Sequence, residues 1–166
     1  MLSMTVGPMY SGKTNKLIYL YKQEPNKNKI AIDFSIDGSD KFITSHDNFK
    51  IPCIKSKTLL DLDVSNYDII YINEYQFFED ILEFVSKSLS NDNKEIYIFG
   101  LDGDFMRNPF EVTNKLLALS NNIVKLNGKC SCGNHSIFSK RLNDNNERIL
   151  YDPTCYKSVC RKCYDK

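Results

Sequence analysis

Gly7-Pro8-Met9-Tyr10-Ser11-Gly12-Lys13-Thr14 is the stretch of sequence that decides the fold of this chain. It matches the pattern GxxxxGK[ST] of a phosphate-binding loop at every fixed position. Residues 2–6 before it are apolar and predict a buried strand, and the helical spacing of apolar residues from 13 to about 24 predicts a helix after it. A strand, a glycine-containing loop and a helix in this order favour a phosphate-binding loop over a simple glycine turn.

The loop residues predict a site for a polyphosphate. Glycines let the backbone curl so that successive N–H groups point inward, and the N-terminus of the following helix adds the positive end of its dipole. Lys13 can reach the β- and γ-phosphates, and the hydroxyl of Thr14 is placed to bind magnesium. We therefore predict that residues 7–14 hold the phosphates and that Thr14 is a ligand of Mg²⁺.

Strands and helices alternate through most of the chain. Further strands are predicted at residues 29–34, 69–72, 95–99 and 123–126, and helices at residues 78–89 and 112–119. This alternation is typical of an α/β fold, in which helices cover both faces of a parallel sheet. We expect a nucleotide-binding domain at 1–126 and a small cysteine-rich domain at 127–166, because ~40 residues are too few for an independent apolar core.

Length and composition limit the classes of protein that fit. The chain has 166 residues, of which 42% are hydrophobic and 26% charged, and this excludes general disorder. A net charge of +1 gives no large basic surface for duplex nucleic acid or an anionic membrane, so neither is an expected partner. The sequence shows neither a transmembrane segment nor a secretory signal, and we expect a cytoplasmic protein.

A glutamate follows the predicted strand at residues 69–72. The carboxyl ends of the strands in such a sheet face the ligand. Glu74 should therefore lie near the phosphates, where a carboxylate can act as general base on a hydroxyl or orient a water. From spacing alone, a solvent-exposed loop acid is an equally good interpretation. Asn73 precedes it, and a neutral amide replaces poorly the aspartate that commonly holds magnesium at this point.

Residues 100–110 follow the next strand end and mix apolar with charged side chains. Leu101, Phe105 and Phe110 offer apolar surface beside acids and an arginine. Such a mixture can line a pocket for a planar base. Aromatic side chains are more often part of a core, so the residues by themselves favour packing beneath a loop.

Five of the six cysteines fall in the last 37 residues. Clustered cysteines in a reducing compartment indicate a metal site more than disulfides. Two pairs can supply four thiolates for a structural, tetrahedral zinc site: Cys130, Cys132, Cys160 and Cys163. The first pair is CxC, one residue shorter than the usual CxxC, and His135 is close enough in sequence to replace a cysteine. Cys53 and Cys155 are left over.

The order of these motifs resembles the thymidine kinases of the cellular and poxviral type, a zinc-containing family distinct from the herpesvirus enzymes. GPMYSGKT at 7–14 is similar to that family's GPMFSGKT, and INEYQFFED at 72–80 to its IDEGQFF. GLDGDFMRNPF at 100–110 matches its GLDGDFxRxPF, and SKRL at 139–142 and YKSVCRKCY at 156–164 match its zinc-domain blocks. Five blocks in one order make the resemblance specific over nearly the whole chain.

The resemblance implies a P-loop fold with a small zinc ribbon and a zinc-tied lasso loop that closes over the base. It implies ATP-dependent transfer of the γ-phosphoryl group to the 5′-hydroxyl of thymidine, with Glu74 as catalytic base, residues 7–14 binding ATP, Mg²⁺ and structural Zn²⁺ as cofactors, and a homotetramer by default.

The resemblance also implies a nucleoside pocket, against the packing interpretation given above. The implied nucleoside-binding residues are Met9, Phe77, Leu101, Phe105, Phe110, Arg141, Leu150, Tyr151, Asp152 and Tyr156. Arg141 is expected on the phosphate side of the nucleoside. Cys132, Cys160 and Cys163 coincide with zinc ligands of the family, whereas Cys130 stands one position from the fourth.

Two departures from the family pattern bear on activity. The family's lasso typically carries IIGG or VIGG, whose backbone groups read the base, whereas residues 149–153 are Ile-Leu-Tyr-Asp-Pro without a glycine. The geometry of this loop must therefore differ. Asn73 replaces an aspartate of the family, although Asp37 keeps an acid that could assist the metal.

Three alternatives stay open at this point. The chain could phosphorylate another deoxynucleoside, such as deoxyuridine or deoxycytidine, or it could be an inactive homologue. It could also be a P-loop ATPase module whose zinc ribbon contacts nucleic acid, because the tail has a basic bias. The basic residues of the tail are Lys129, Lys140, Arg141, Arg148, Lys157, Arg161, Lys162 and Lys166.

Overall fold

The computed structural model describes residues 1–25, 27–35, 41–90 and 94–166. Its centre is a six-stranded sheet in which every pair of neighbouring strands is parallel. In spatial order the strands are β5 (Ile54–Ser56), β2 (Lys29–Phe34), β6 (Ile69–Asn73), β7 (Glu95–Gly100), β1 (Leu2–Val6) and β8 (Asn122–Lys125). The predicted parallel sheet is confirmed, and all five predicted strands belong to it.

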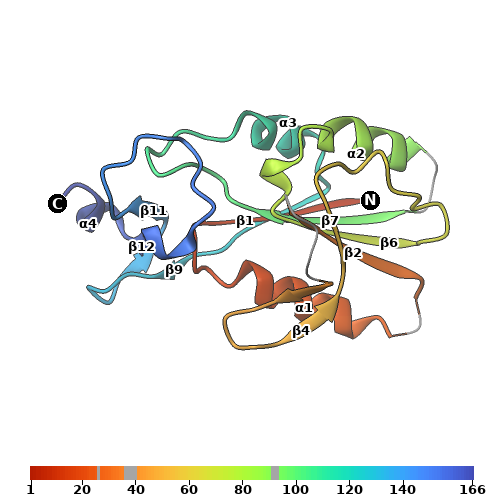
Figure 1. Cartoon of the computed structure of the whole chain (residues 1–166), viewed down its shortest axis with the longest axis horizontal. Coiled ribbons are helices and arrows are strands. Elements are labelled where there is room, and N and C mark those ends of the chain that lie inside the picture. Colours follow the sequence, from red (N-terminus) through yellow and green to blue (C-terminus); the bar gives the residue numbers. More distant parts are fainter. Residues whose placement is uncertain (26, 36–40, 91–93) are drawn as a thin grey trace.

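Helices cover both faces of this sheet. α2 (Ile81–Ser90) and α3 (Glu111–Leu119) lie on one face, whereas α1 (Lys13–Gln23) and the hairpin of β3 (Phe42–Thr44) and β4 (Lys50–Pro52) lie on the other (Figure 1). No helix in the described ranges combines the length and the apolar character needed to cross a bilayer.

Alternate side chains of the central strands supply the two layers of the core. In β6, Ile70 and Ile72 pack in the layer formed with α2 and α3, whereas Ile69 and Tyr71 pack in the layer formed with α1 and the β3–β4 hairpin. Burying one such side chain contributes about 1.5–3 kcal/mol. A one-residue shift of a strand would exchange the two sets of side chains, so both layers help to fix the register.

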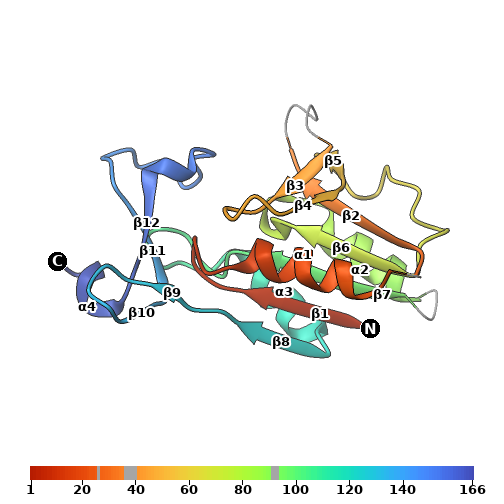
Figure 2. The same ribbon diagram turned by 90° about the horizontal axis from the view of Figure 1, so that it is seen from below.

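A smaller part of the chain lies beyond the carboxyl ends of the strands (Figures 1 and 2). It contains the pairs β9 (Gly128–Lys129) with β10 (His135–Ser136) and β11 (Phe138–Arg141) with β12 (Tyr156–Val159), followed by the short helix α4 (Arg161–Tyr164). The boundary expected near residue 127 falls between β8 and β9, and the division into two domains there stays a prediction.

The second predicted helix begins later than expected. The sequence predicts a helix over residues 78–89, but α2 begins at Ile81, so the start of this prediction is wrong. Glu74 has a φ of +53°, and residues 75–77 form a single 3-10 turn. Phe78 leaves that turn in an extended conformation with its ring buried in the core. The apolar pattern at Phe78 thus reflects burial without a helix.

Seven strands in the described residues are absent from the predictions, namely β3, β4 and β5 in the larger part of the chain and β9–β12 in the smaller part. β3, β4 and β5 have three residues each, which is less than the roughly 4–8 residues over which alternation predicts a strand. β5 extends the sheet beside β2, and the β3–β4 hairpin buries Ile43 and Ile51. Asp37, the acid considered for the metal, lies outside the described residues.

The side-chain amide of Asn73 is hydrogen-bonded to Asp33, the residue opposite it in β2. Its Cα pairs with that of Asp33, and its Nδ2 donates a hydrogen bond to Asp33 Oδ1 at 2.8 Å. The other carboxylate oxygen of Asp33 accepts from Lys55 Nζ at 2.5 Å. An aspartate at position 73 would place a second carboxylate directly opposite the first, and like charges in paired positions are destabilising.

Asn73→Asp should therefore destabilise the fold by about 1–3 kcal/mol, because a hydrogen bond to a buried carboxylate is replaced by repulsion. Adding Asp33→Asn restores an amide opposite a carboxylate and should recover most of the loss. Urea denaturation of the parent, the single variant and the double variant measures both effects. Equal instability of the two variants would contradict this account.

Candidate active site

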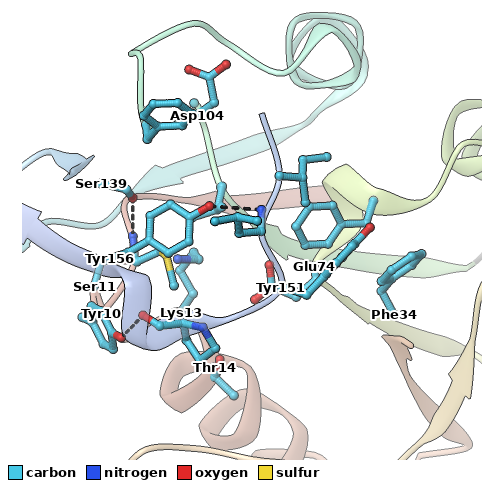
Figure 3. Close-up of a pocket in the computed structure, with 18 of the residues that line it drawn as sticks. Tyr10, Ser11, Lys13, Thr14, Phe34, Glu74, Asp104, Ser139, Tyr151 and Tyr156 are labelled. Atoms are coloured by element: carbon cyan, nitrogen blue, oxygen red, sulfur yellow. Dashed lines mark hydrogen bonds between the residues drawn. The ribbon is translucent and has the colours of Figure 1, made fainter. Parts of the chain in front are cut away.

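A pocket of about 570 Å³ lies at the carboxyl edge of the sheet (Figure 3). Its walls come from the phosphate loop, the end of β2, the tip of the β3–β4 hairpin, the segment after β6, residues 101–110 and residues 148–156. These segments are far apart in the sequence. They meet because parallel strands all end at the same edge.

The phosphate loop leads from β1 into α1, as the sequence predicts. Gly12, the N-cap of α1, has a φ of +84°, a left-handed conformation that favours glycine. Lys13 Nζ donates to the carbonyl of Pro8 at 2.8 Å. Burial lowers the pKa of Lys13, and the nearby carboxylates of Glu74 and Asp102 partly offset this. A buried ammonium at a helix N-terminus favours an anionic ligand.

Six of the eight predicted loop residues line the pocket, and Gly7 and Pro8 do not. The six are Met9, Tyr10, Ser11, Gly12, Lys13 and Thr14. The hydroxyl of Ser11 is buried without a hydrogen-bond partner, so it fits an oxygen-rich ligand. The N–H of Met9 instead donates to Ser139 Oγ at 2.9 Å (Figure 3), which joins the loop to β11.

Glu74 stands directly after β6 and lines the pocket, held by a neighbouring amide. Gln76 Nε2 donates to Glu74 Oε2 at 2.6 Å, and Gln76 Oε1 accepts from the N–H of Leu101 at 3.0 Å. Gly100 leaves room for this bridge, because a Cβ there would lie 2.1 Å from Gln76 Oε1. Gln76 thus fixes one oxygen of Glu74 against the segment that follows β7. It is inside the quoted INEYQFFED block, yet nothing in the spacing singled it out.

The protonation of Glu74 depends on the same contacts. Burial raises the pKa of its carboxyl group, while Lys13 and the hydrogen bond from Gln76 act in the opposite direction. A carboxylate that is desolvated in this way is a stronger proton acceptor than an ordinary surface glutamate. The arrangement can therefore take a proton from a hydroxyl that lies near the phosphate loop.

Apolar rings form another wall of the pocket. Phe77, Leu101, Phe105 and Phe110 line it, together with Phe34 at the end of β2. Phe110 is also well buried, at 6% exposure, so the packing interpretation and the pocket interpretation both hold for this ring. Flat apolar walls beside a few polar groups suit the base of a nucleoside.

Residues 142–155 join β11 to β12 and are called the lasso segment below. The ring of Tyr151 is stacked on Phe34, with centroids 6.1 Å apart and planes 15° apart, and lies 5.3 Å from the ring of Phe77 (Figure 3). Leu150 and Tyr151 line the pocket, whereas Asp152 does not. Side chains occupy the position where the resemblance implies glycines.

Two arginines hold the lasso segment in place. Arg141 donates to backbone carbonyls of the segment and to the hydroxyl of Tyr156. Arg148 Nε donates to Asp104 Oδ2 at 3.0 Å, on the loop after β7. Arg141 is buried and is not among the residues that line the pocket, and its expected place on the phosphate side of the nucleoside stays a prediction. Tyr156 does line the pocket, and its hydroxyl also accepts from the N–H of Leu150 (Figure 3).

Further pocket residues were not identified from the sequence. They are Asn15, Phe34, His46, Asp47, Gly103, Asp104, Ser139, Arg148, Ile149 and Pro153. His46 and Asp47 lie between the two unpredicted strands β3 and β4, where no local pattern marks them. The SKRL motif could have identified Ser139, because this serine is its first residue.

The four predicted cysteines come together. Their Sγ atoms all lie within 4.8 Å of one another, and Cys132 Sγ is 3.5 Å from that of Cys130 and 3.6 Å from that of Cys160. Tetrahedral zinc with Zn–S bonds of about 2.3 Å requires sulfurs roughly 3.8 Å apart, so the set fits this metal. In the described part of the chain the cluster does not include His135. Gly133, with φ of +87°, closes the turn after the CxC pair.

P-loop kinases place a phosphate loop and a carboxylate at one edge of a parallel sheet, and this chain has that arrangement. The family model described as "Thymidine kinase" matches residues 1–164. The chain therefore belongs to the thymidine kinase family, and the resemblance found in its sequence is confirmed.

The similarity of this chain to its relatives extends over nearly the whole of this chain. The thymidine kinase of sheeppox virus is 36% identical over 98% of this chain and 96% of the relative, and that of vaccinia virus (strain Western Reserve) is 32% identical over 98% and 96%. Thymidine kinase 1 of Dictyostelium discoideum is 36% identical over 99% of this chain and 77% of the relative. A chain in a solved structure of Pif1 helicases has a TM-score of 0.41 at 16% identity, over 75% of this chain and 39% of that one, too weak a likeness for any argument.

Proposed function

We propose that this chain phosphorylates thymidine at its 5′-hydroxyl, with ATP as donor, to give thymidine monophosphate. One observation carries the proposal: a single pocket is lined by the phosphate loop, by Glu74 and by a wall of apolar rings. A triphosphate and a nucleoside can thus occupy it together, with a carboxylate available to the hydroxyl that is to be phosphorylated. Membership of the thymidine kinase family supports thymidine as the nucleoside.

The proposed mechanism uses positioning and charge neutralisation. The N–H groups of the phosphate loop and the ammonium of Lys13 hold the triphosphate and spread the charge of the transferring phosphoryl group. Glu74 accepts the proton of the 5′-hydroxyl as the new O–P bond forms and the bond to ADP breaks. The hydroxyl of Thr14 would hold Mg²⁺, which neutralises phosphate charge when bound.

The proposed base site is the ring wall together with the lasso segment. Met9, Phe77, Leu101, Phe105, Phe110, Leu150, Tyr151 and Tyr156 line the pocket and would contact the nucleoside. In this proposal Arg141 and Asp152 do not contact the nucleoside themselves but support residues of the lasso segment. Arg141 supports the carbonyls of the lasso segment and the hydroxyl of Tyr156, and Asp152 accepts from the N–H of Thr154 at 2.9 Å.

The cysteine cluster is proposed to hold one structural Zn²⁺ that pins the ends of the smaller part of the chain. Four thiolates leave no open coordination position, so a catalytic role is not part of the proposal. A cytoplasmic homotetramer, with no nucleic acid or membrane partner, completes the proposal by resemblance to the family.

The central test is phosphoryl transfer from labelled ATP, with magnesium, to each deoxynucleoside in turn. Thymidine should be the preferred acceptor, and Glu74→Gln should lower kcat by about 10²–10⁴-fold, as for loss of a general base. Glu79→Gln, a change at an exposed acid of the same loop, is the matched control and should behave as the parent.

Three results would overturn this proposal. A preference for deoxyuridine or deoxycytidine would change the substrate, and ATP hydrolysis stimulated by single-stranded DNA without nucleoside phosphorylation would favour the nucleic-acid module. Near-normal turnover of Glu74→Gln would remove the carboxylate from the mechanism.

Gln76 gives a prediction about pH. Its hydrogen bond lowers the pKa of Glu74, so Gln76→Leu should raise that pKa. The base acts only when deprotonated, hence kcat should begin to fall at a higher pH in the variant than in the parent as the solution is made acidic. A kcat–pH profile measures this, with Gln23→Leu at the exposed end of α1 as control. An unshifted acid limb would show that Gln76 does not set the proton affinity of Glu74.

The zinc site gives a prediction about metal content. The purified chain should contain about one zinc per chain, and Cys132→Ser should lose most of it together with thermal stability, because the ends of β9–β12 would no longer be joined. Cys155→Ser, outside the four-cysteine cluster, should keep the metal. Atomic absorption and a thermal melt check both points. Full zinc in the Cys132 variant would exclude that thiolate as a ligand.

A further inference from the structure

The phosphate loop and the lasso segment are joined by one direct hydrogen bond. The hydroxyl of Tyr10 donates to the backbone carbonyl of Pro153 at 2.7 Å (Figure 3). The two residues are 143 positions apart, and both line the pocket. The bond therefore connects the segment proposed to hold the triphosphate with the segment proposed to cover the base.

The side chain of Tyr10 is held in a particular position although 42% of the residue is exposed. Its backbone has a φ of +60°, an unusual conformation for a residue with a side chain, which persists where the surroundings impose it. Its ring lies 5.1 Å from the ring of His46, at the tip of the β3–β4 hairpin. Three separate segments of the chain thus meet at this one side chain.

Phosphate binding does not explain the hydroxyl. Position 10 is a variable position of GxxxxGK[ST], where the loop uses backbone N–H groups and any side chain satisfies the pattern. The motif GPMFSGKT, to which residues 7–14 are similar, has phenylalanine at this position, so the hydroxyl is not part of the pattern that carries the resemblance. This hydroxyl donates to the backbone carbonyl of Pro153.

The acceptor is also presented by a constrained backbone. Pro153 begins a 3-10 turn over Pro153–Cys155, and the carboxylate of Asp152 caps that turn by accepting from the N–H of Thr154. The proline ring fixes φ. The same carbonyl accepts from the N–H of Tyr156. A donor held by the hairpin therefore meets an acceptor held by a turn, two residues from the Tyr151 ring that stacks on Phe34.

We propose that Tyr10 is a positioning residue for the nucleoside: its hydroxyl holds the lasso segment over the base wall and couples nucleoside binding to occupation of the phosphate loop. This rests on the proposed function for the identity of the two ligands. Loss of the bond loosens the turn at Pro153, although Arg141 and Arg148 still hold other parts of the lasso segment. The nucleoside must then order this turn on binding, whereas the backbone N–H groups of the phosphate loop are unchanged. Coupling between two binding sites is reciprocal.

Steady-state kinetics of Tyr10→Phe test the proposal. Removing one hydrogen bond of this kind should raise the KM for thymidine about 3- to 10-fold and change the KM for ATP much less. A non-hydrolysable ATP analogue should tighten thymidine binding to the parent, measured calorimetrically, and should do so less in the variant. Tyr19→Phe, which removes the hydroxyl of a tyrosine 61% exposed on α1, is the matched control. Equal changes in both KM values, or no change, would overturn the proposal.

Hydrogen–deuterium exchange supplies a readout that needs no activity. In the ligand-free protein, peptides covering residues 143–155 should exchange faster in Tyr10→Phe than in the parent or in Tyr19→Phe. Unchanged exchange there would refute the positioning role even if the enzyme phosphorylates thymidine. Faster exchange together with no phosphorylation of any nucleoside by the parent would refute the proposed function and leave the contact between the two segments standing.

Discussion

In an all-parallel sheet every strand delivers its carboxyl end to the same edge, and the site depends on this constraint. β1 leads into the phosphate loop, β6 into Glu74 and β7 into Leu101. Because β7 lies between β1 and β6, the loop and the carboxylate start from strands roughly 10 Å apart, twice the spacing of neighbours. That separation leaves room for a substrate hydroxyl between the carboxylate of Glu74 and a phosphate on the loop. Lys13 and Glu74 are still close enough to affect each other's pKa. A helical bundle offers no such convergence.

The sheet supplies only part of the enclosure, and the remainder comes from the smaller part of the chain. Arg141 is central there, since its guanidinium lies 3.9 Å from the centre of the Phe105 ring and also donates to lasso carbonyls. One buried cation thus links a ring of the pocket wall to the segment opposite. Ser139 in the same strand holds the N–H of Met9. The four cysteines lie next to β9 and β12, and the zinc proposed to bind them would influence the pocket only through the packing of these strands.

The sequence predicts those features of the fold and site whose patterns lie within a few consecutive residues. The phosphate loop, its flanking elements and the cysteine pairs are patterns within a few residues, and the structure places them as predicted. The helix predicted from Phe78 starts too early because a short apolar run looks the same in a buried extended segment as in a helix. His46 and Asp47 reach the pocket through a hairpin whose strands are too short to show a period. Arg141 shares a block with the family motif, yet its direction depends on carbonyls of residues 145–148, which no spacing rule contains.

The lasso segment lines the pocket without the glycines that the resemblance implies at this place. Glycine allows close backbone approach but leaves many conformations to be restricted on folding. In this chain Tyr151 supplies a ring against Phe34, Pro153 restricts the backbone, and Arg148 pairs with Asp104. The side chains of a conformationally restricted segment make the contacts here. A glycine-containing segment would instead bring its flexible backbone close to the ligand. In the proposed base site the Tyr151 ring and its two aromatic neighbours form one wall, so we expect nucleoside preference to depend on residues outside the phosphate loop.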